Sequence, residues 1–597
     1  MSFRRVSRLA LLALATLLEL SCGQVYRPVV IPVNTVPPNP ANFHAIYGIA
    51  TNAPGNPGTA MQFDVSGDTD VGAENMGVNP THAAILPNNS RVFVANAGSL
   101  VPGEGDIITA FTPASASGLG APTVFTLPTA GAGSSSSISA ITEVGSLVTV
   151  SVSSPLSNAV VNASITIEGV KPTGYNGSFP IANINGNLIQ YVDPTAGLAQ
   201  GSGGTATVPV ICQYLPDYVT TSQNTAVFVA NFGAENNPNC NRASTDSVAL
   251  LNPATSAVTN ISYLGAGTHP VAMVETPDAL NLYVVNQGNN TVNDLSPVDL
   301  TPLCPGGAPP CPISVPGTPT WIVARADSHR IYVLTQGSGQ LVPIDTATNT
   351  VLPSQTNLSV GAGANFILYD PNLNRLYVTN PVTGNVFVFS DTGGVNDTPT
   401  LLATISMTQG TNPPCQSTAH APVSCAPVGV AALRDGSRFY VASYEREASC
   451  PPDANSASPC VIPRMTVFNA LTYAVIPPAK GVVSLLPPSF SLLTLPFAAT
   501  QYAVPELANC VPVATYTPGA TRFRMFAAAS EDGSRVYASS CDAGSVAIIQ
   551  TTTSTTSTGQ NNAEDILVTD LLAPFSATPV TSGEPPPQSP VFLLVGQ

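Results

Sequence analysis

The stretch ANFILYDPNLNRLYVTNP, residues 364–381, decides the fold of this chain. It contains an apolar strand, a tight polar turn, and a second strand in which Tyr377 is followed by small or β-branched residues. The alternation in the second strand places the aromatic ring on one face and small side chains on the other, and Asp and Asn favour a short hairpin loop. The stretch therefore predicts an antiparallel hairpin that is buried on both faces.

Six further copies of this pattern lie along the chain, and their aromatic residues align with Tyr377. These aligned aromatics are Phe93, Phe228, Tyr283, Tyr332, Tyr440 and Tyr537. Several copies are followed by two more strands joined by a turn, as in QLVPIDTATNTV (340–351), SVALLNPATSAV (247–258) and RMTVFNALTYAV (464–475). A four-stranded unit repeated in this way predicts an all-β fold, a β-propeller whose blades bury each other's faces.

The segment RLYVTN (375–380), its relatives FVAN, YVVN and YVAS, and the patterns VPIDTATNTV and ALLNPATSAV resemble the YVTN-repeat β-propeller family. This family contains bacterial and archaeal surface and periplasmic proteins and is related to lactonase-type propellers. The resemblance covers most of residues 44–129 and 214–597. It implies the fold, with seven blades as the usual number, and it specifies little about activity.

The two ends of the repeat region favour eight blades over seven. AIYGIATN (45–52) and AMQFDVSGD (60–68) match the second and third strands of a unit that lacks its first strand. SPVFLLVG (589–596) is suited to supply that strand and to close the ring. A closed ring removes the sheet edges that invite aggregation.

Segments outside the repeats divide the chain further. Phe93 and Phe228 lie 135 residues apart, about three times the spacing of a blade. The residues between them contain the strands SLVTVSV, ASITIEGV, SFPIANI and NLIQYV, with Asn176-Gly177 as an expected hairpin turn. The expected organisation is a signal peptide at 1–22, a Pro-rich tether at 23–43, the first part of the propeller at 44–134, a small inserted β-domain at 135–210, and the rest of the propeller at 211–597.

The N-terminus predicts export. Three arginines precede the apolar stretch LALLALATLLELS, which ends at Cys22 and Gly23. The segment resembles a bacterial lipoprotein signal, in which Cys22 carries the lipid, although Glu19 and Leu20 depart from the usual pattern. Ordinary cleavage and an uncleaved anchor are the alternatives. The resemblance implies a lipid-anchored protein of the outer membrane, cell surface or periplasm.

The charge distribution argues against nucleic acid as a partner. The chain has 34 acidic and 18 basic residues, with a net charge of -16, and no basic cluster to neutralise phosphates. The remaining ten cysteines form an even number, which predicts disulfides in an exported chain. Pairing in sequence order gives Cys212–Cys240, Cys304–Cys311, Cys415–Cys425, Cys450–Cys460 and Cys510–Cys541.

Few residues are candidates for chemistry. His82 and His269 occupy equivalent places at the start of first strands, near the expected mouth of the channel. Asp64, Asp68, Asp70 and Glu74 lie in one loop, as in some calcium sites, but their spacing does not match the helix-flanked calcium loop. Each set also has a structural interpretation, as a repeat position that tolerates polar residues and as acidic turns. We assign no catalytic residue, no cofactor and no metal from the sequence.

Two functions remain open. The repeats, the export signal and the stapled loops favour a non-enzymatic binding or scaffold protein of the bacterial cell envelope. Its loops and inserted β-domain would contact an envelope protein or a glycan, and the lipid on Cys22 would contact the membrane. The alternative is a lactonase-type hydrolase, which the family resemblance implies without supplying matching residues.

Overall fold

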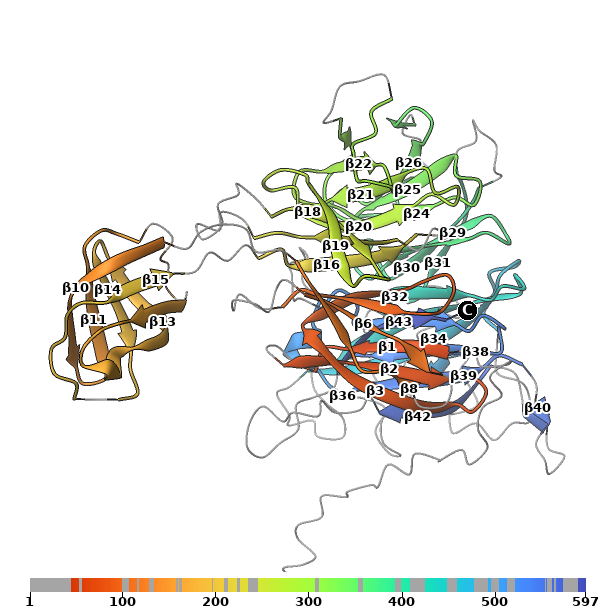
Figure 1. Ribbon diagram of the computed structural model, residues 1–597. Helices are drawn as coiled ribbons and strands as arrows, with labels where there is room; N and C mark the ends of the chain where they lie inside the picture. The colour runs from red at the N-terminus through yellow and green to blue at the C-terminus, as the bar shows by residue number, and fades with distance from the viewer. Residues whose placement is uncertain are drawn as a thin grey trace, which may run out of the picture. The chain divides into compact units, whose positions relative to one another are not determined.

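The computed structural model describes most of the chain between residues 45 and 596 (Figure 1). The longer described segments are 45–52, 56–98, 107–114, 118–127, 134–156, 164–195, 197–208, 213–222, 226–234, 245–305, 311–352, 358–391, 399–408, 425–447, 459–476, 504–512, 521–552, 565–572 and 589–596. The expected signal peptide with Cys22 and the Pro-rich segment 23–43 lie outside the described residues.

Eight antiparallel sheets form the propeller, and the strands of each blade follow one another from the axis outward. In this order, blade 1 contains β43 (Pro590–Val595), β1 (Ala45–Ala50), β2 (Pro57–Asp64) and β3 (Thr69–Val78), and blade 2 contains β4 (Pro80–Ile85), β5 (Val92–Asn96), β6 (Ile107–Phe111) and β9 (Thr123–Thr126). Blade 3 contains β16 (Pro216–Thr221), β17 (Val227–Asn231), β18 (Ser247–Asn252) and β19 (Ala257–Tyr263), and blade 4 contains β20 (Pro270–Glu275), β21 (Leu282–Asn286), β22 (Thr291–Leu295) and β23 (Ile313–Ser314).

The second half of the ring repeats this plan. Blade 5 contains β24 (Pro319–Ala324), β25 (Arg330–Thr335), β26 (Gln340–Asp345) and β27 (Thr350–Val351), and blade 6 contains β28 (Phe366–Asp370), β29 (Arg375–Asn380), β30 (Asn385–Ser390) and β31 (Thr400–Ser406). Blade 7 contains β32 (Cys425–Ala432), β33 (Arg438–Glu447), β34 (Cys460–Asn469) and β35 (Leu492–Thr494), with β36 (Val504–Pro505) also paired with β34, and blade 8 contains β37 (Met525–Ala529), β38 (Arg535–Ser540), β39 (Ser545–Gln550) and β42 (Ile566–Leu572). The ribbons β7 (Pro113–Ala114) with β8 (Gly118–Leu119) and β40 (Ser554–Thr555) with β41 (Asn561–Asn562) lie outside the blades.

The ring closes as the sequence predicts. The innermost strands contact one another in the order β43, β4, β16, β20, β24, β28, β32 and β37, and β37 contacts β43 again. Strand β43 pairs antiparallel with β1, and the Gly596 N–H donates a 2.8 Å hydrogen bond to the Ala45 carbonyl. Both ends of the repeat region therefore form one blade, and the propeller has eight blades.

The aligned aromatics hold successive blades together. All seven lie on second strands and are fully buried, and Tyr47 of β1 completes the set in blade 1. Burial of one such ring stabilises a fold by about 1.5–3 kcal/mol. Several tyrosine hydroxyls also reach the next blade, as Tyr440 does to Asp565 at 2.5 Å.

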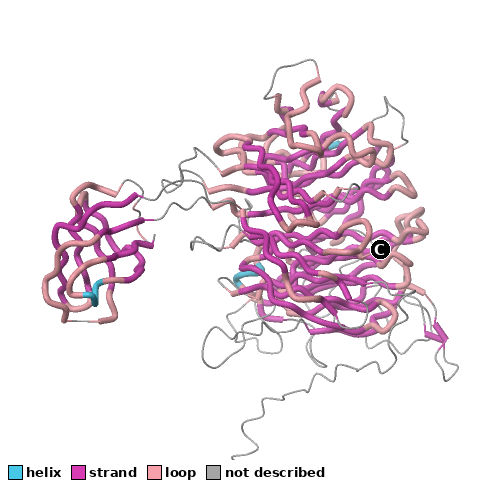
Figure 2. Tube along the Cα trace, in the orientation of Figure 1, coloured by secondary structure: helices cyan, strands magenta, loops and turns pink. Residues whose placement is uncertain are grey.

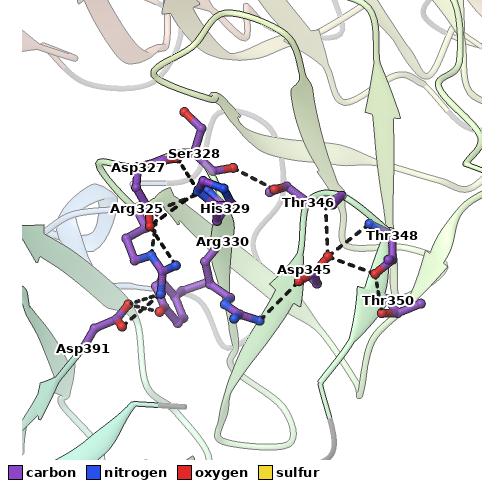
Figure 3. Close-up of polar contacts among 12 residues, drawn as sticks. Arg325, Asp327, Ser328, His329, Arg330, Asp345, Thr346, Thr348, Thr350 and Asp391 are labelled. Atoms are coloured by element: carbon purple, nitrogen blue, oxygen red, sulfur yellow. Dashed lines mark hydrogen bonds and ion pairs between the residues drawn. The ribbon is translucent and has the colours of Figure 1, made fainter. Parts of the chain in front are cut away.

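Arginine side chains add polar contacts between blades 5 and 6 (Figure 3). Arg325 is 1% exposed and donates hydrogen bonds to Asp327 and to Asp391, which follows β30 in blade 6. Burial lowers the pKa of Arg325, but the hydrogen bond to Asp327 and the charge of Asp391 outweigh it and raise the pKa above its usual value. Tyr332 also donates a hydrogen bond to Asp391. The two carboxylates compensate the buried charge of Arg325 with charge-assisted hydrogen bonds, which are stronger than neutral ones.

The inserted β-domain is a closed six-stranded barrel with its own core. Its strands are β10 (Ser134–Val144), β11 (Leu147–Val152), β12 (Ser164–Glu168), β13 (Gly177–Asn185), β14 (Leu188–Val192) and β15 (Thr205–Val208). The four strands singled out in the sequence are β11 to β14, and β10 and β15 close the barrel. Ser134 pairs with Val208, so the chain enters and leaves the barrel on adjacent strands.

Two local predictions are wrong. Asn176-Gly177 is not a two-residue hairpin turn, because the single helical turn η2 (Thr173–Tyr175) precedes it and Gly177 already begins β13. Asn176 instead bonds both backbone groups of Val170. In blade 7, Val475 forms only an isolated bridge with Phe468, and β35 supplies the fourth strand. Figure 2 shows that helix is limited to such short turns within the described chain.

Two predicted disulfides, Cys304–Cys311 and Cys510–Cys541, are present. Cys425 and Cys460 are also disulfide-bonded, but their expected partners Cys415 and Cys450 lie outside the described residues, as do Cys212 and Cys240. Among the residues that the structure describes, no helix is long and apolar enough to cross a membrane.

Candidate functional site

The axis of the propeller is formed by one repeated position of the innermost strands. In each blade, the residue at this position pairs with the second-strand residue that lies two positions after the aligned aromatic. In blade 5, for example, Trp321 pairs with Leu334, which lies two positions after Tyr332. The register places these residues there, in blade order 1 to 8: Phe592, His82, Tyr218, Ala272, Trp321, Phe366, Gly429 and Phe526. Six of the eight blades therefore point a ring toward the axis, and the other two carry small residues.

These six rings and Phe523 form a continuous cluster that we call the axial plug. The residue Phe523 precedes β37 and is 1% exposed. Its ring centroid lies 5.3 Å from Trp321 and 4.9 Å from Phe526. Most of these contacts are tilted or T-shaped, the arrangement that aromatic quadrupoles favour. The plug fills the axis with apolar side chains.

One side of the plug is covered by a segment that crosses the axis. Arg522 precedes β37 in blade 8, yet it donates a 2.9 Å hydrogen bond to the Val271 carbonyl in blade 4, on the opposite side of the ring. The same guanidinium pairs with Asp217 of blade 3 at 3.1 Å and lies 5.5 Å from the Trp321 ring centroid. The disulfide Cys510–Cys541 holds the chain just before this segment. We call this side, where the innermost strands begin, the entry face.

The two candidate histidines do not occupy equivalent positions. His82 belongs to the plug and stacks on Tyr218 at 3.8 Å, whereas His269 precedes β20 and stacks on Phe232 at 4.3 Å. The His82 Nδ1–H donates to the Val219 carbonyl at 3.0 Å, and burial lowers the pKa of His82 to about 3. His82 is therefore a neutral, packed ring. His269 bonds the Phe232 carbonyl at 2.9 Å.

The four acidic residues do not share one loop, because Asp64 ends β2, Asp68 lies in the turn that follows, and Asp70 and Glu74 lie in β3. Asp64 accepts hydrogen bonds from Ser66, and Asp68 receives Arg535 of blade 8 in a bidentate ion pair at 2.6 and 2.9 Å. Burial raises the pKa of Asp70 to about 6. Within the described parts of the chain, no group of three or more His, Cys, Asp or Glu side chains is placed to hold a metal ion.

A cavity opens on the opposite side of the plug, where the innermost strands end. We call this side the exit face, and the cavity has a volume of about 640 Å³. The plug residues Phe366 and Phe526 line it, together with Leu368, Tyr369, Val430, Ala432, Ala528 and Leu593. Its polar lining comes from Asp370, Asn372, Arg434, Ser530 and Glu531, and Arg434 pairs with Glu531. The arrangement suits an apolar group with a polar surround.

The sequence contains a signal for the plug beyond the repeat pattern itself. Proline stands two residues before the ring at Pro80, Pro216, Pro319 and Pro590, and also before the small residues Ala272 and Gly429. The strand pairing shifts register between the proline and the axial residue in these blades. A Pro-x-aromatic pattern at the start of first strands thus marks the axial position.

Comparison with known proteins gives fold information only. No protein-family model and no curated protein sequence matches the chain. Among solved structures, it is similar to the Kuenenia stuttgartiensis hydrazine synthase, with 16% identity, a TM-score of 0.39, and coverage of 60% of this chain and 86% of that chain.

It is also similar to a putative 6-phosphogluconolactonase from Bacteroides fragilis, with 13% identity, a TM-score of 0.39, and coverage of 74% and 95%. The Pseudomonas aeruginosa periplasmic gluconolactonase matches with 14% identity, a TM-score of 0.38, and coverage of 72% and 94%. The likeness to lactonase-like propellers is distant, and we transfer neither a site nor an activity from it.

Proposed function

We propose that this protein is a non-enzymatic binding or scaffold protein of the bacterial cell envelope, exported and anchored through Cys22. The axial plug is the observation that supports this proposal. Seven packed rings occupy the place where blades converge, so the converging side chains contact one another instead of a substrate. Membership of the YVTN-repeat propeller family is part of the same proposal.

The exit-face cavity is the surface that we assign to the partner. Its volume of about 640 Å³ lies in the range of small-ligand pockets, and it accommodates a few side chains. Phe, Leu, Val and Ala side chains make up most of its lining, together with the buried Asp370 and Ser530, whereas the charged pair Arg434–Glu531 stands at 62% and 24% exposure. An apolar interior with a polar rim matches the anatomy of protein interfaces. We therefore propose an envelope protein that inserts an apolar side chain, in preference to a glycan, which needs a lining in which polar groups predominate.

Site-specific photo-crosslinking in intact cells tests this proposal. A photoreactive residue at Glu531 should form an adduct with an envelope protein, and the same residue at Val298, 83% exposed in blade 4, should not. Ala528→Trp fills the cavity from its wall and should remove the adduct.

Three results would contradict the proposal. They are an adduct that survives Ala528→Trp, turnover of lactones by the purified chain, and binding of purified envelope glycan that is lost in Ala528→Trp. The second result would establish the hydrolase alternative, and the third would replace the protein partner by a glycan.

A further inference from the structure

Arginines at the start of second strands reach the following blade at several junctions. Arg91 donates a 2.5 Å hydrogen bond to the Pro253 carbonyl, and Arg438 donates a 2.9 Å hydrogen bond to the Thr551 carbonyl. Arg375 bonds the equivalent Ala470 carbonyl. The accepting carbonyl in each case directly follows the third strand of the next blade, so the contact is a repeated feature of the fold.

A second group of the next blade completes these junctions, except at Arg91. It is a positive-φ residue between the third and fourth strands. In blades 8 and 1 this residue is an aspartate, and Asp565 receives Arg438 as Asp68 receives Arg535. In blade 7 it is Tyr473, whose ring lies 5.2 Å from the Arg375 guanidinium. In blade 3, the blade that follows Arg91, the residue at this place is the exposed, uncharged Ser256.

Arg91 is thus left with a single acceptor. The Pro253 carbonyl uses one of the five N–H donors of the guanidinium, and no carboxylate in the described part of the chain pairs with it. Its guanidinium lies over the rings of Phe93 and Phe125 at 5.7 and 5.5 Å, which fix its position. Burial lowers the pKa of Arg91, and no acidic neighbour counteracts this effect.

A cavity of about 430 Å³ adjoins this arginine. It lies between blades 2 and 3, and its apolar lining includes Leu86, Ala226, Leu250 and Leu251. Asn88, Ser90, Asn252 and Thr259 contribute amide and hydroxyl groups. The cavity therefore combines one partly buried cation, several neutral hydrogen-bonding groups and an apolar wall.

We propose that this cavity binds a small monocarboxylate with a short apolar chain. The carboxylate takes the place beside Arg91 that Asp565 and Asp68 take in other junctions, and the chain lies against the leucines. A single cation in a chain of net charge -16 favours a monoanion over a phosphate dianion. This site is distinct from the exit-face cavity, so a test of ligand binding here is independent of the function proposed above.

Titration calorimetry with hexanoate at low ionic strength tests the site, with neutral hexanamide and inorganic phosphate as comparison probes. Hexanoate should bind at least about tenfold more tightly than either, the difference expected for one charge-assisted contact. Arg91→Gln should remove this preference. Ser256→Asp should also remove this preference, because the introduced carboxylate forms an ion pair with Arg91 and competes with the ligand. This variant should be more thermostable than the wild type.

Arg375→Gln is the matched control, because it removes an equivalent junction contact far from the cavity and should leave hexanoate binding unchanged. Equal binding of hexanoate and hexanamide would overturn the proposal. So would unchanged binding in Ser256→Asp, which tests the idea even if Arg91→Gln fails to fold. Tighter binding of phosphate than of hexanoate would show that the site takes a different anion.

Discussion

Replacing Phe592 by alanine should weaken the whole ring, because this residue lies both in the closing strand and in the axial plug. Phe592 is 5% exposed, and its ring centroid lies 4.4 Å from His82 and 4.6 Å from Phe526. Truncation of a buried phenylalanine costs about 3–5 kcal/mol through lost burial and the remaining cavity. Because β43 is held in its blade only by β1, little rearrangement is available to fill the space. We expect a loss of about 4 kcal/mol.

The chain contains a natural probe for this experiment. Trp321 is the single tryptophan, and its ring lies in the plug 5.5 Å from Phe366. Tryptophan fluorescence in a urea titration therefore reports unfolding of the propeller axis and not of the barrel. Phe592→Leu should cost less than Phe592→Ala, because it retains most of the apolar volume, and Val382→Ala, at 74% exposure, should change stability by less than about 0.5 kcal/mol. A loss below about 1 kcal/mol for Phe592→Ala would refute the closure of the ring through packed axial rings.

Three further outcomes follow from the structure. Burial holds the pKa of His82 near 3, below its unfolded value of 6.5. Between these two pH values the unfolded chain binds a proton that the folded chain does not, so the free energy of unfolding decreases as the pH is lowered. Between pH 7.5 and 4.5 the wild type should lose about 2–3 kcal/mol more than His82→Phe in urea titrations. A double-mutant cycle of Arg535→Gln and Asp68→Asn should give a coupling of about 1–2 kcal/mol that shrinks in 1 M salt, and a coupling near zero would argue against this junction. Replacing Cys510 and Cys541 by serine should cost about 2–4 kcal/mol by tryptophan fluorescence, and reduction of the wild type with dithiothreitol, which also opens the other disulfides, should cost at least as much.

The blades were predictable because each repeats one local pattern. Tyr377 and its six counterparts mark second strands by alternation alone. The tight polar turn of the pattern is formed by Asp435-Gly436-Ser437 in blade 7 and by Asp532-Gly533-Ser534 in blade 8, with positive φ at each glycine. The pairing of 589–596 with β1 was also accessible, since a unit without its first strand requires one from elsewhere.

The axial contacts were not predictable, because they join residues from different blades with no common spacing. Arg522 reaches Val271 across 251 positions of sequence, and only the ring geometry brings the two together. The positions of His82 and His269 were misjudged for a related reason. His82 lies two residues after Pro80, at the axial position, whereas His269 directly precedes Pro270, and Ala272 takes the axial position in that blade.

The closing strand has a consequence for biosynthesis. During translation, blades 2 to 8 have all their strands before β43 emerges from the ribosome, but β1 has no inner neighbour and the rings of His82 and Phe526 have a gap between them. The propeller therefore completes its fold only after its last strand is made. Until that strand is synthesised, blades 2 to 8 can form but the ring stays open.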